Sequence, residues 1–488
     1  MNKEFRPSAY QQKIFNFVEN DRRSGMITAV AGSGKTTTIV KSLELIPRGK
    51  YTLFLAFNKS IAEELKTRVP AHVKAATFHS VGYGATRKAF PKVQIDSKKT
   101  WKLIRENLGD LEQELYGAFI GKVVGLAKGA GIGYLIPDDQ ASWFRLVDHY
   151  DVYLDSEDAE LQTGIELARK ILKRSVEVAG ELIDFDDMLY IPLVKNLRFW
   201  QNDFVFIDEA QDTNPVQVAL LKRMLKPGGR LIAVGDPHQA IYGFRGADSD
   251  AMNRLSEEFA CVQLPLSVSY RCPQSVVEAA QAFVSHIEAH PDAPVGVVGP
   301  AQIEGKLKEY FQSSDAILCR TTAPLIDYVY QLIREQVPCR VMGREIGQGL
   351  VTLIKKMKAK NIDTLITRLG VYREREIAQY VSKGQEEKCQ VVEDKVESLL
   401  TVVNNLPENN RTVAELIRSI EALFTDNGAG VLTLATVHKS KGLEWDRVFI
   451  LARDKMPSKW ARKSWQYQQE INLIYVAYTR SKKELYFL

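Results

Sequence analysis

The sequence of 488 residues has few cysteines, no long apolar run and little net charge. The five cysteines are scattered, and no two of them form a CxxC pair. This usage argues against a disulfide framework or a zinc module and is typical of a reducing compartment. No uninterrupted apolar run approaches the ~18 residues of a membrane span, and the N-terminal MNKEFRPSAY lacks an apolar signal segment. We therefore expect a soluble, intracellular protein, cytoplasmic and without a membrane partner.

A net charge of +5 is mild for this length. Any binding of nucleic acid must therefore come from a local groove rather than from an overall polycation. The composition, with 45% hydrophobic residues, is that of ordinary globular material. At about 150 residues per domain, the length corresponds to three or four units.

The order of apolar runs predicts two α/β cores. Short β-prone and helical runs alternate over residues 1–85, and two strongly apolar runs resume the pattern at 204–207 and 231–234. By the neighbour-pairing rule these two strands join the first sheet. A second α/β pattern begins near Cys261 with CVQLPL. We predict one core from 1–85 and 181–260 with a helical insertion at 86–180, and another from 261–344 and 427–488 with a short helical insertion at 345–426.

The most informative stretch is GMITAVAGSGKTTT at residues 25–38. It has the strand, loop and helix order of a phosphate-binding P-loop, although Ala29 stands where the full pattern has its first glycine. Loop N–H groups and the positive end of the helix favour bound phosphate. Lys35 can neutralise the β and γ charges, and the Thr36 hydroxyl can bind Mg²⁺. The alternative is a glycine-rich turn without function.

A second signal is FVFIDEAQD at 204–212, an apolar strand that ends in adjacent carboxylates. Asp208 is placed to bind Mg²⁺, and Glu209 can orient and deprotonate the attacking water. Such a pair alone is a weak signal, because many strands end in acidic loops. Together with the P-loop it predicts an ATPase.

A third signal is VGDPHQAIYGFRGAD at 234–248. Gln239 can sense the γ-phosphate, and an aromatic and basic cluster follows within a few residues: Tyr242, Phe244 and Arg245. Aromatic rings beside an arginine suit base stacking, at about 1–3 kcal/mol per stacked base. In the alternative interpretation, the two rings pack beneath the loop.

Later motifs are SYRCP at 269–273, TVHKSKGLEWD at 436–446 and NLIYVAYTRSKKEL at 472–485. Arginines on a second core can reach a bound nucleotide as fingers, which raises rates by about 10³–10⁵ in related chemistry. Arg271 and Arg480 are the candidates, and either can instead be a surface charge. The basic segments 354–360 and 452–463 can contact DNA or be solvated, so neither is assigned to a site.

Together, these motifs resemble those of superfamily 1A DNA helicases of the UvrD, Rep and PcrA type. The segments FNKSIA, TFHSVGYG, DFDDMLYIPL and GDPHQAIYGFRGA are most similar to the helicase core of the F-box DNA helicases. The resemblance runs from Ser8 to Leu485 and is weakest in the helical insertions. It implies an α/β fold of two RecA-like, parallel-sheet P-loop domains, each with a mainly helical inserted subdomain. It also implies an ATP- and Mg²⁺-dependent enzyme that moves 3′–5′ on single-stranded DNA and unwinds duplex DNA.

The resemblance further implies roles for individual residues. ATP is bound by Gln11 (with Gln12 as the alternative), Ala31, Gly32, Ser33, Gly34, Lys35, Thr36 and Thr37, with Tyr270 near the adenine and Glu444 near the ribose. Mg²⁺ is bound by Thr36 and Asp208. The catalytic set is Lys35, Asp208, Glu209, Gln239, Arg271 and Arg480. Single-stranded DNA is contacted by Asn58, Phe78, His79, Tyr242, Phe244, Arg245, Thr436 and His438.

A second function stays open, that of a single-stranded DNA translocase that strips proteins from DNA with little unwinding. A DNA-binding module that does not translocate is disfavoured, because the whole catalytic set is present. The expected partners are single-stranded DNA, junctions of single- and double-stranded DNA, and proteins of replication or recombination, and we expect a monomer. The resemblance also makes a helicase-nuclease of the RecB type unexpected, because the sequence stops soon after TRSKKEL.

Overall fold

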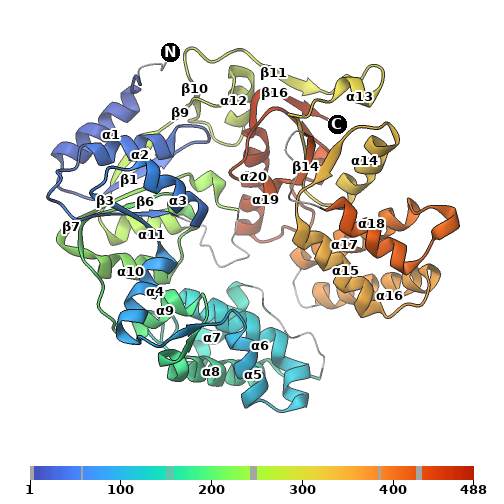
Figure 1. Cartoon of the computed structure of the whole chain (residues 1–488), viewed down its shortest axis with the longest axis horizontal. Coiled ribbons are helices and arrows are strands. Elements are labelled where there is room, and N and C mark those ends of the chain that lie inside the picture. The colour runs from blue at the N-terminus through green and yellow to red at the C-terminus, as the bar shows by residue number, and fades with distance from the viewer. Residues whose placement is uncertain are drawn as a thin grey trace. The chain divides into compact units, whose positions relative to one another are not determined.

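The computed structural model describes residues 5–56, 59–150, 152, 154, 158–241, 250–382, 386–424 and 431–488. Two compact units make up the chain (Figure 1). Unit 1 comprises Met1–Ala29 and Gly34–Leu266, and unit 2 comprises Val30–Ser33 and Ser267–Leu488. Each unit contains a six-stranded sheet in which all strand pairs are parallel. The predicted class, α/β with parallel sheets, is confirmed.

The sheet of unit 1 has the strand order β3-β2-β6-β7-β1-β8. Its strands are β1 (Gly25–Ala29), β2 (Thr52–Ala56), β3 (Val73–Thr77), β6 (Asn202–Ile207), β7 (Leu225–Gly235) and β8 (Val262–Leu266). β2 is buried along its whole length, as expected of a strand covered on both faces. Alternate residues face opposite layers, so that Phe54 packs in one core cluster and Leu55 in the other.

Helices cover both faces of this sheet (Figure 1). One core cluster contains residues of α1 (Ala9–Asn20), α2 (Lys35–Glu44) and α3 (Lys59–Arg68). The other contains residues of α4 (Phe78–Ala89), α9 (Asp187–Val194), α10 (Pro215–Met224) and α11 (Ala251–Glu258). The sheet therefore lies between these two layers of helices within unit 1.

One strand belongs to a different core from the one that the sequence predicts. The apolar run after Cys261 predicts the start of the second core, but β8 pairs with β1 from Gly25↔Val262 to Ala29↔Leu266 and closes the first sheet. Unit 1 accordingly extends to Leu266. An apolar strand of five residues carries the same pattern in either sheet, so only the pairing distinguishes them.

A helical part of unit 1 lies between β3 and β6 in the sequence. It contains β4 (Gln94–Ile95), α5 (Lys99–Asn107), α6 (Asp110–Ala130), α7 (Gln140–His149), α8 (Leu161–Glu177) and β5 (Leu182–Ile183). Its apolar core surrounds a buried ionic cluster. Lys99 Nζ lies 2.6 Å from Asp187 Oδ2, and Lys128 Nζ lies 2.7 Å from Asp184 Oδ2 and 2.8 Å from Asp187 Oδ1. The cluster joins α5 and α6 to α9, which packs beneath the sheet.

The sheet of unit 2 has the order β11-β16-β15-β12-β14-β13. Its strands are β11 (Val297–Pro300), β12 (Ala316–Cys319), β13 (Cys339–Val341), β14 (Leu432–Thr436), β15 (Trp445–Ile450) and β16 (Ser481–Phe487). A separate parallel pair is formed by β9 (Val268–Ser269) and β10 (Glu288–Ala289). The helices around these strands are α12 (Gln274–Gln281), α13 (Leu307–Tyr310), α14 (Ala323–Arg334), α19 (Val437–Ser440) and α20 (Ser464–Tyr478).

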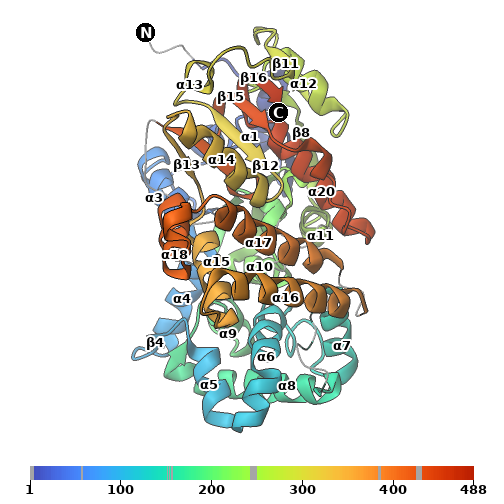
Figure 2. The same cartoon turned by 90° about the vertical axis from the view of Figure 1, so that its right-hand side faces the viewer.

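The described residues between β13 and β14 include the 3₁₀ turn Glu408–Asn410 and four α-helices, which are labelled in Figure 2. They are α15 (Arg344–Met357), α16 (Ile362–Ser382), α17 (Glu386–Asn404) and α18 (Val413–Leu423). They share one apolar core with α14 and the sheet. The basic segment 452–463 meets acidic residues of α17: Lys459 Nζ lies 3.1 Å from Glu393 Oε1, and Arg462 Nη1 lies 2.7 Å from Glu386 Oε1.

Candidate functional site

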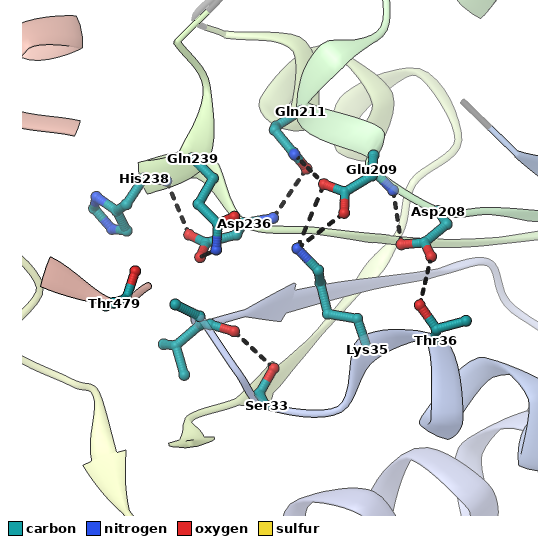
Figure 3. Close-up of polar contacts among 12 residues, drawn as sticks. Ser33, Lys35, Thr36, Asp208, Glu209, Gln211, Asp236, His238, Gln239 and Thr479 are labelled. Atoms are coloured by element: carbon teal, nitrogen blue, oxygen red, sulfur yellow. Dashed lines mark hydrogen bonds and ion pairs between the residues drawn. The ribbon is translucent and has the colours of Figure 1, made fainter. Parts of the chain in front are cut away.

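Polar side chains gather at the carboxyl ends of three neighbouring strands of unit 1: β1, β6 and β7 (Figure 3). α2 begins after the loop that follows β1, Asp208 and Glu209 follow β6, and Asp236 follows β7. In open α/β sheets, ligands bind outside the carboxyl ends of the strands. In the described part of unit 1, these side chains therefore lie where a ligand site is expected.

The loop between β1 and α2 depends on glycine backbone conformations. Gly32 and Gly34 have φ values of 71° and 75°, in the left-handed region that favours glycine. Gly34 is the residue before the first turn of α2 and supplies no side-chain cap to it. The N–H groups of this turn are therefore available to an anion, and the helix dipole favours negative charge there.

Lys35 and Thr36, at the start of α2, contact the two carboxylates that follow β6. Lys35 Nζ lies 3.3 Å from Glu209 Oε1 and 3.4 Å from Oε2, while Thr36 Oγ1 donates to Asp208 Oδ2 at 3.0 Å. The N–H of Glu209 donates to Asp208 Oδ1 at 2.8 Å. The two motifs predicted from separate stretches of sequence thus meet at one place.

The charged side chains at this site shift one another's pKa values. Burial disfavours the charged form of Lys35, but the carboxylates of Glu209, Asp236 and Asp208 outweigh this and raise its pKa. Burial and then repulsion from Glu209 raise the pKa of Asp208 to about 6, against the opposing attraction of Lys35. Burial also raises the pKa of Asp236. A cation bound beside these carboxylates would favour their charged forms and so oppose the effect of burial.

Two residues of this site were not predicted from the sequence. Gln211 Nε2 donates to Glu209 Oε2 at 2.5 Å, and its Oε1 accepts the Asp236 N–H at 3.0 Å. Asp236 Oδ2 in turn accepts from Gln239 Nε2 at 2.7 Å. Hydrogen bonds therefore run from Glu209 through Gln211 and Asp236 to Gln239, linking the ends of β6 and β7 (Figure 3). Both missed residues stand inside the quoted motifs, but only the fold shows that they meet.

Glu209 has a strained backbone. Its φ is 55°, which is uncommon for a residue other than glycine. Such conformations cost of order 1–3 kcal/mol and cluster at functional sites. Here the strain turns the chain from β6 into the 3₁₀ turn Ala210–Asp212 and holds the carboxylate toward Lys35.

Gln11, one of two alternatives for the adenine contact, lies against the phosphate loop. It is 2% exposed, its Nε2 donates to Thr38 Oγ1 at 2.9 Å, and it completes the capping box of α1 with Ser8. Gln12 is exposed and donates to Asn16 Oδ1 at 3.1 Å. Of the two glutamines, Gln11 is the one that contacts α2, and the adenine contact itself stays a prediction. Thr37 is partly exposed on α2, and Ser33, in the segment that belongs to unit 2, donates to the Val30 carbonyl at 2.8 Å.

The predicted residues of unit 2 form their own group. Arg271 Nε lies 2.5 Å from Glu444 Oε2, and the Arg271 side chain is 21% exposed. Arg480 is 1% exposed and donates to the carbonyls of Val476 and Leu443 at 3.0 and 3.2 Å. Arg480 therefore joins α20 to the segment before β15 within unit 2. Of the two predicted fingers, only Arg271 has appreciable exposure. Tyr270 is 42% exposed, with its ring centroid 4.9 Å from that of His290.

Four predicted DNA contacts are described by the structure. Phe78 is 5% exposed and packs in the core beneath the sheet, so its ring has no face available for a base. His79, next to it, is partly exposed, and burial lowers its pKa. In unit 2, Thr436 ends β14 and His438 lies partly exposed in α19. The other four predicted contacts lie outside the described residues: Asn58, Tyr242, Phe244 and Arg245.

Two family descriptions match the chain. Residues 10–260, more than half of the chain, match the UvrD/REP helicase N-terminal domain, and residues 344–488 match the UvrD-like helicase C-terminal domain. In the part of the chain that the structure describes, no helix is both long and apolar enough to cross a bilayer.

Among curated proteins, the chain is similar to F-box DNA helicase protein 1 of Schizosaccharomyces pombe, with 25% identity over 94% of the chain and 55% of that protein. It is 26% identical to F-box DNA helicase 1 of Gallus gallus, over 97% of the chain and 48% of that protein. It is 24% identical to a probable DNA helicase II homolog of Mycoplasma pneumoniae, over 94% of the chain and 81% of that protein. The chain spans about half the length of the two F-box relatives.

Proposed function

The chain belongs to the UvrD/REP helicase family, and on that premise we propose that it is an ATP-driven motor that moves 3′–5′ on single-stranded DNA and unwinds duplex DNA. The observation that carries the proposal is the hydrogen-bonded path from Lys35 and Glu209 through Gln211 and Asp236. This path connects the phosphate loop with the end of β7. Residues 242–249, which contain three of the predicted DNA contacts, begin seven positions after Gly235, the last residue of β7.

The phosphates of ATP would lie on the loop before α2 and on the amino end of that helix. Lys35 would then exchange its contact with Glu209 for the more highly charged phosphates. This exchange releases the Glu209 carboxylate to accept a proton from the attacking water, while Gln211 continues to hold it in place. The Lys35–Glu209 ion pair is thus the resting form of the proposed catalytic pair.

The residues present also fit Mg²⁺. The Thr36 hydroxyl and the Asp208 carboxylate are oxygen ligands of the kind that Mg²⁺ prefers, and they already lie 3.0 Å apart. A magnesium ion bound there would neutralise phosphate charge as the reaction proceeds. Burial and then repulsion from Glu209 raise the pKa of Asp208, and a cation bound there would favour its charged form.

Movement requires that the affinity for DNA differ between nucleotide states, since a ligand with equal affinity for two states shifts neither. Gln239 reports the nucleotide state in this proposal because it is bonded to Asp236 at the end of β7. Arg271 is the proposed arginine finger, and its contact with Glu444 must be exchanged for that role. Arg480 must leave its carbonyl partners to act as a second finger.

We also propose four subdomains. The first core comprises residues 1–85 and 181–266, its helical insertion 86–180, the second core 267–344 and 427–488, and the second insertion 345–426. This retains the boundaries expected from the sequence, except that β8 moves to the first core because of its pairing with β1.

An unwinding assay on duplexes with a 3′ or a 5′ single-stranded tail tests the proposal, with ATP hydrolysis followed in parallel. We expect unwinding of the 3′-tailed substrate alone, and only with ATP and Mg²⁺. Unwinding of the 5′-tailed substrate alone would refute the direction. DNA-stimulated hydrolysis without unwinding would favour the alternative function, a translocase that strips proteins from DNA.

A further inference from the structure

Two exposed aromatic side chains lie at the amino ends of strands of the unit 1 sheet, whereas the proposed ATP site lies at the carboxyl ends. Tyr51 directly precedes β2 and Trp200 lies two residues before β6, so both stand at amino ends of strands. Tyr51 is 52% exposed and Trp200 is 68% exposed. With five residues in β2, at about 3.3 Å per residue, the two edges are about 16 Å apart. The proposed catalytic residues do not reach this edge.

The two rings are held in a defined arrangement. Their centroids are 5.3 Å apart, with an interplanar angle of 82°. Asp203 fixes the Tyr51 backbone, because its Oδ2 accepts the Tyr51 N–H at 2.9 Å and its own N–H donates to the Tyr51 carbonyl at 2.8 Å. Large exposed rings on a rigid sheet edge keep apolar surface in water, an arrangement that marks binding surfaces.

The surroundings of these rings are strongly basic. Segments 48–51, 195–203 and 225–230 hold six lysines or arginines and a single carboxylate, that of Asp203. Lys226 Nζ lies 4.6 Å from the Tyr51 ring centroid and 2.9 Å from Asp203 Oδ2, so this carboxylate is already neutralised. Four of the other cations are exposed to solvent: Arg48, Lys50, Lys195 and Arg198.

We propose that this surface, the aromatic-basic edge formed by Tyr51, Trp200 and those four exposed cations, binds a segment of single-stranded nucleic acid separate from the strand that the motor tracks. Exposed aromatic rings beside lysine and arginine are the chemistry that holds unpaired bases and their phosphates. The charge of this edge favours a polyanion over a neutral or cationic partner. Its four exposed charged side chains are cations, and its one carboxylate, that of Asp203, is paired with Lys226. The surface is independent of the proposed function, because all the predicted DNA contacts of unit 1 lie at the other edge or outside the described residues.

The test is photocrosslinking of the full chain with decamers of thymidine or uridine that carry one 5-iodopyrimidine. We expect a crosslinked peptide that contains Trp200 or Tyr51, and the DNA and RNA arms show which sugar is preferred. The double variant Lys50→Glu with Arg198→Glu should lower this crosslink at least tenfold. Trp200→Ala should remove it with an unchanged melting temperature, because the ring is mostly exposed.

The matched control is Lys92→Glu with Lys98→Glu, two exposed lysines in the helical part of unit 1. It makes the same change in net charge and should leave the crosslink unchanged. If two phosphate contacts are lost in the test variant, the salt dependence of this crosslink should fall by about 1.4 in log–log slope, at about 0.7 per phosphate.

Two results would overturn the proposal: no crosslink at this edge in the wild type, or a crosslink that the charge reversal leaves intact. A surface that serves a protein partner instead gives the first of these results. Stimulation of ATP hydrolysis by the same decamers reports on the proposed motor separately. Intact stimulation with no crosslink at either Trp200 or Tyr51 therefore refutes this inference alone.

Discussion

Replacing Gln211 with alanine removes the link between the proposed base and the end of β7. Gln211 is 1% exposed, and its amide joins the Glu209 carboxylate at 2.5 Å to the Asp236 N–H at 3.0 Å. A hydrogen bond to a charged group contributes about 1.5–3 kcal/mol. At about 1.36 kcal/mol per factor of ten, its loss from the transition state lowers kcat by about 10–150-fold.

The assay is steady-state ATP hydrolysis at saturating single-stranded DNA, in which kcat and KM are separated. Gln211 acts through Glu209 in our account, so kcat should fall while KM for ATP changes less than about threefold. The matched control is Gln162→Ala, which removes a glutamine that donates to Glu166 Oε1 at 3.1 Å on the exposed face of α8. Circular dichroism verifies that both variants are folded.

The reasoning is refuted if kcat of the folded Gln211→Ala variant stays within twofold of the wild type. A rise in KM alone would also contradict it, because that pattern assigns Gln211 to ATP binding rather than to positioning the base. An equal loss in Gln162→Ala would show that the effect is not specific to the site.

Three further changes test other parts of the structure. Lys35→Ala should abolish ATP turnover and leave measurable DNA binding, and unaltered turnover would remove the P-loop assignment. Glu209→Gln should bind ATP and accumulate in the ATP-bound state, since the amide cannot accept the proton; rapid hydrolysis would exclude Glu209 as the base. Lys99→Met should lower the free energy of unfolding of unit 1 by about 3–5 kcal/mol in urea, because Asp187 loses one buried partner at 2.6 Å. The exposed neighbour Lys98→Met should change it by less than about 0.5 kcal/mol, and equal losses would contradict the role given to the buried cluster.

The core of the site was predictable because its signals are local. The phosphate loop and the acidic pair each follow an apolar strand in the sequence, and carboxyl ends of parallel strands meet at one edge. The structure brings Lys35 and Thr36 to Asp208 and Glu209 as those patterns predict. Gln211 was missed because its role depends on the N–H group of Asp236, which lies 25 residues further along the chain.

Other positions could not be predicted from patterns. β8 has the apolar pattern of a core strand, and only its hydrogen bonds to β1 assign it to the first sheet. Phe78 stands in a motif beside His79, yet its ring packs beneath the sheet. The burial of Arg480 could not be predicted either. The sequence identifies a charge within a motif, but it does not show the carbonyls to which this arginine donates. Burial is a property of the packed chain, and a single residue type does not encode it.

The central claim, that ATP drives directed movement along one DNA strand, is tested most directly by stopped-flow translocation. Single strands of increasing length carry a fluorophore at either the 5′ or the 3′ end, and ATP starts the reaction with the protein already bound. Our account predicts a signal from the 5′ end whose delay grows in proportion to length. A delay that does not depend on length, or arrival at the 3′ end, would contradict it.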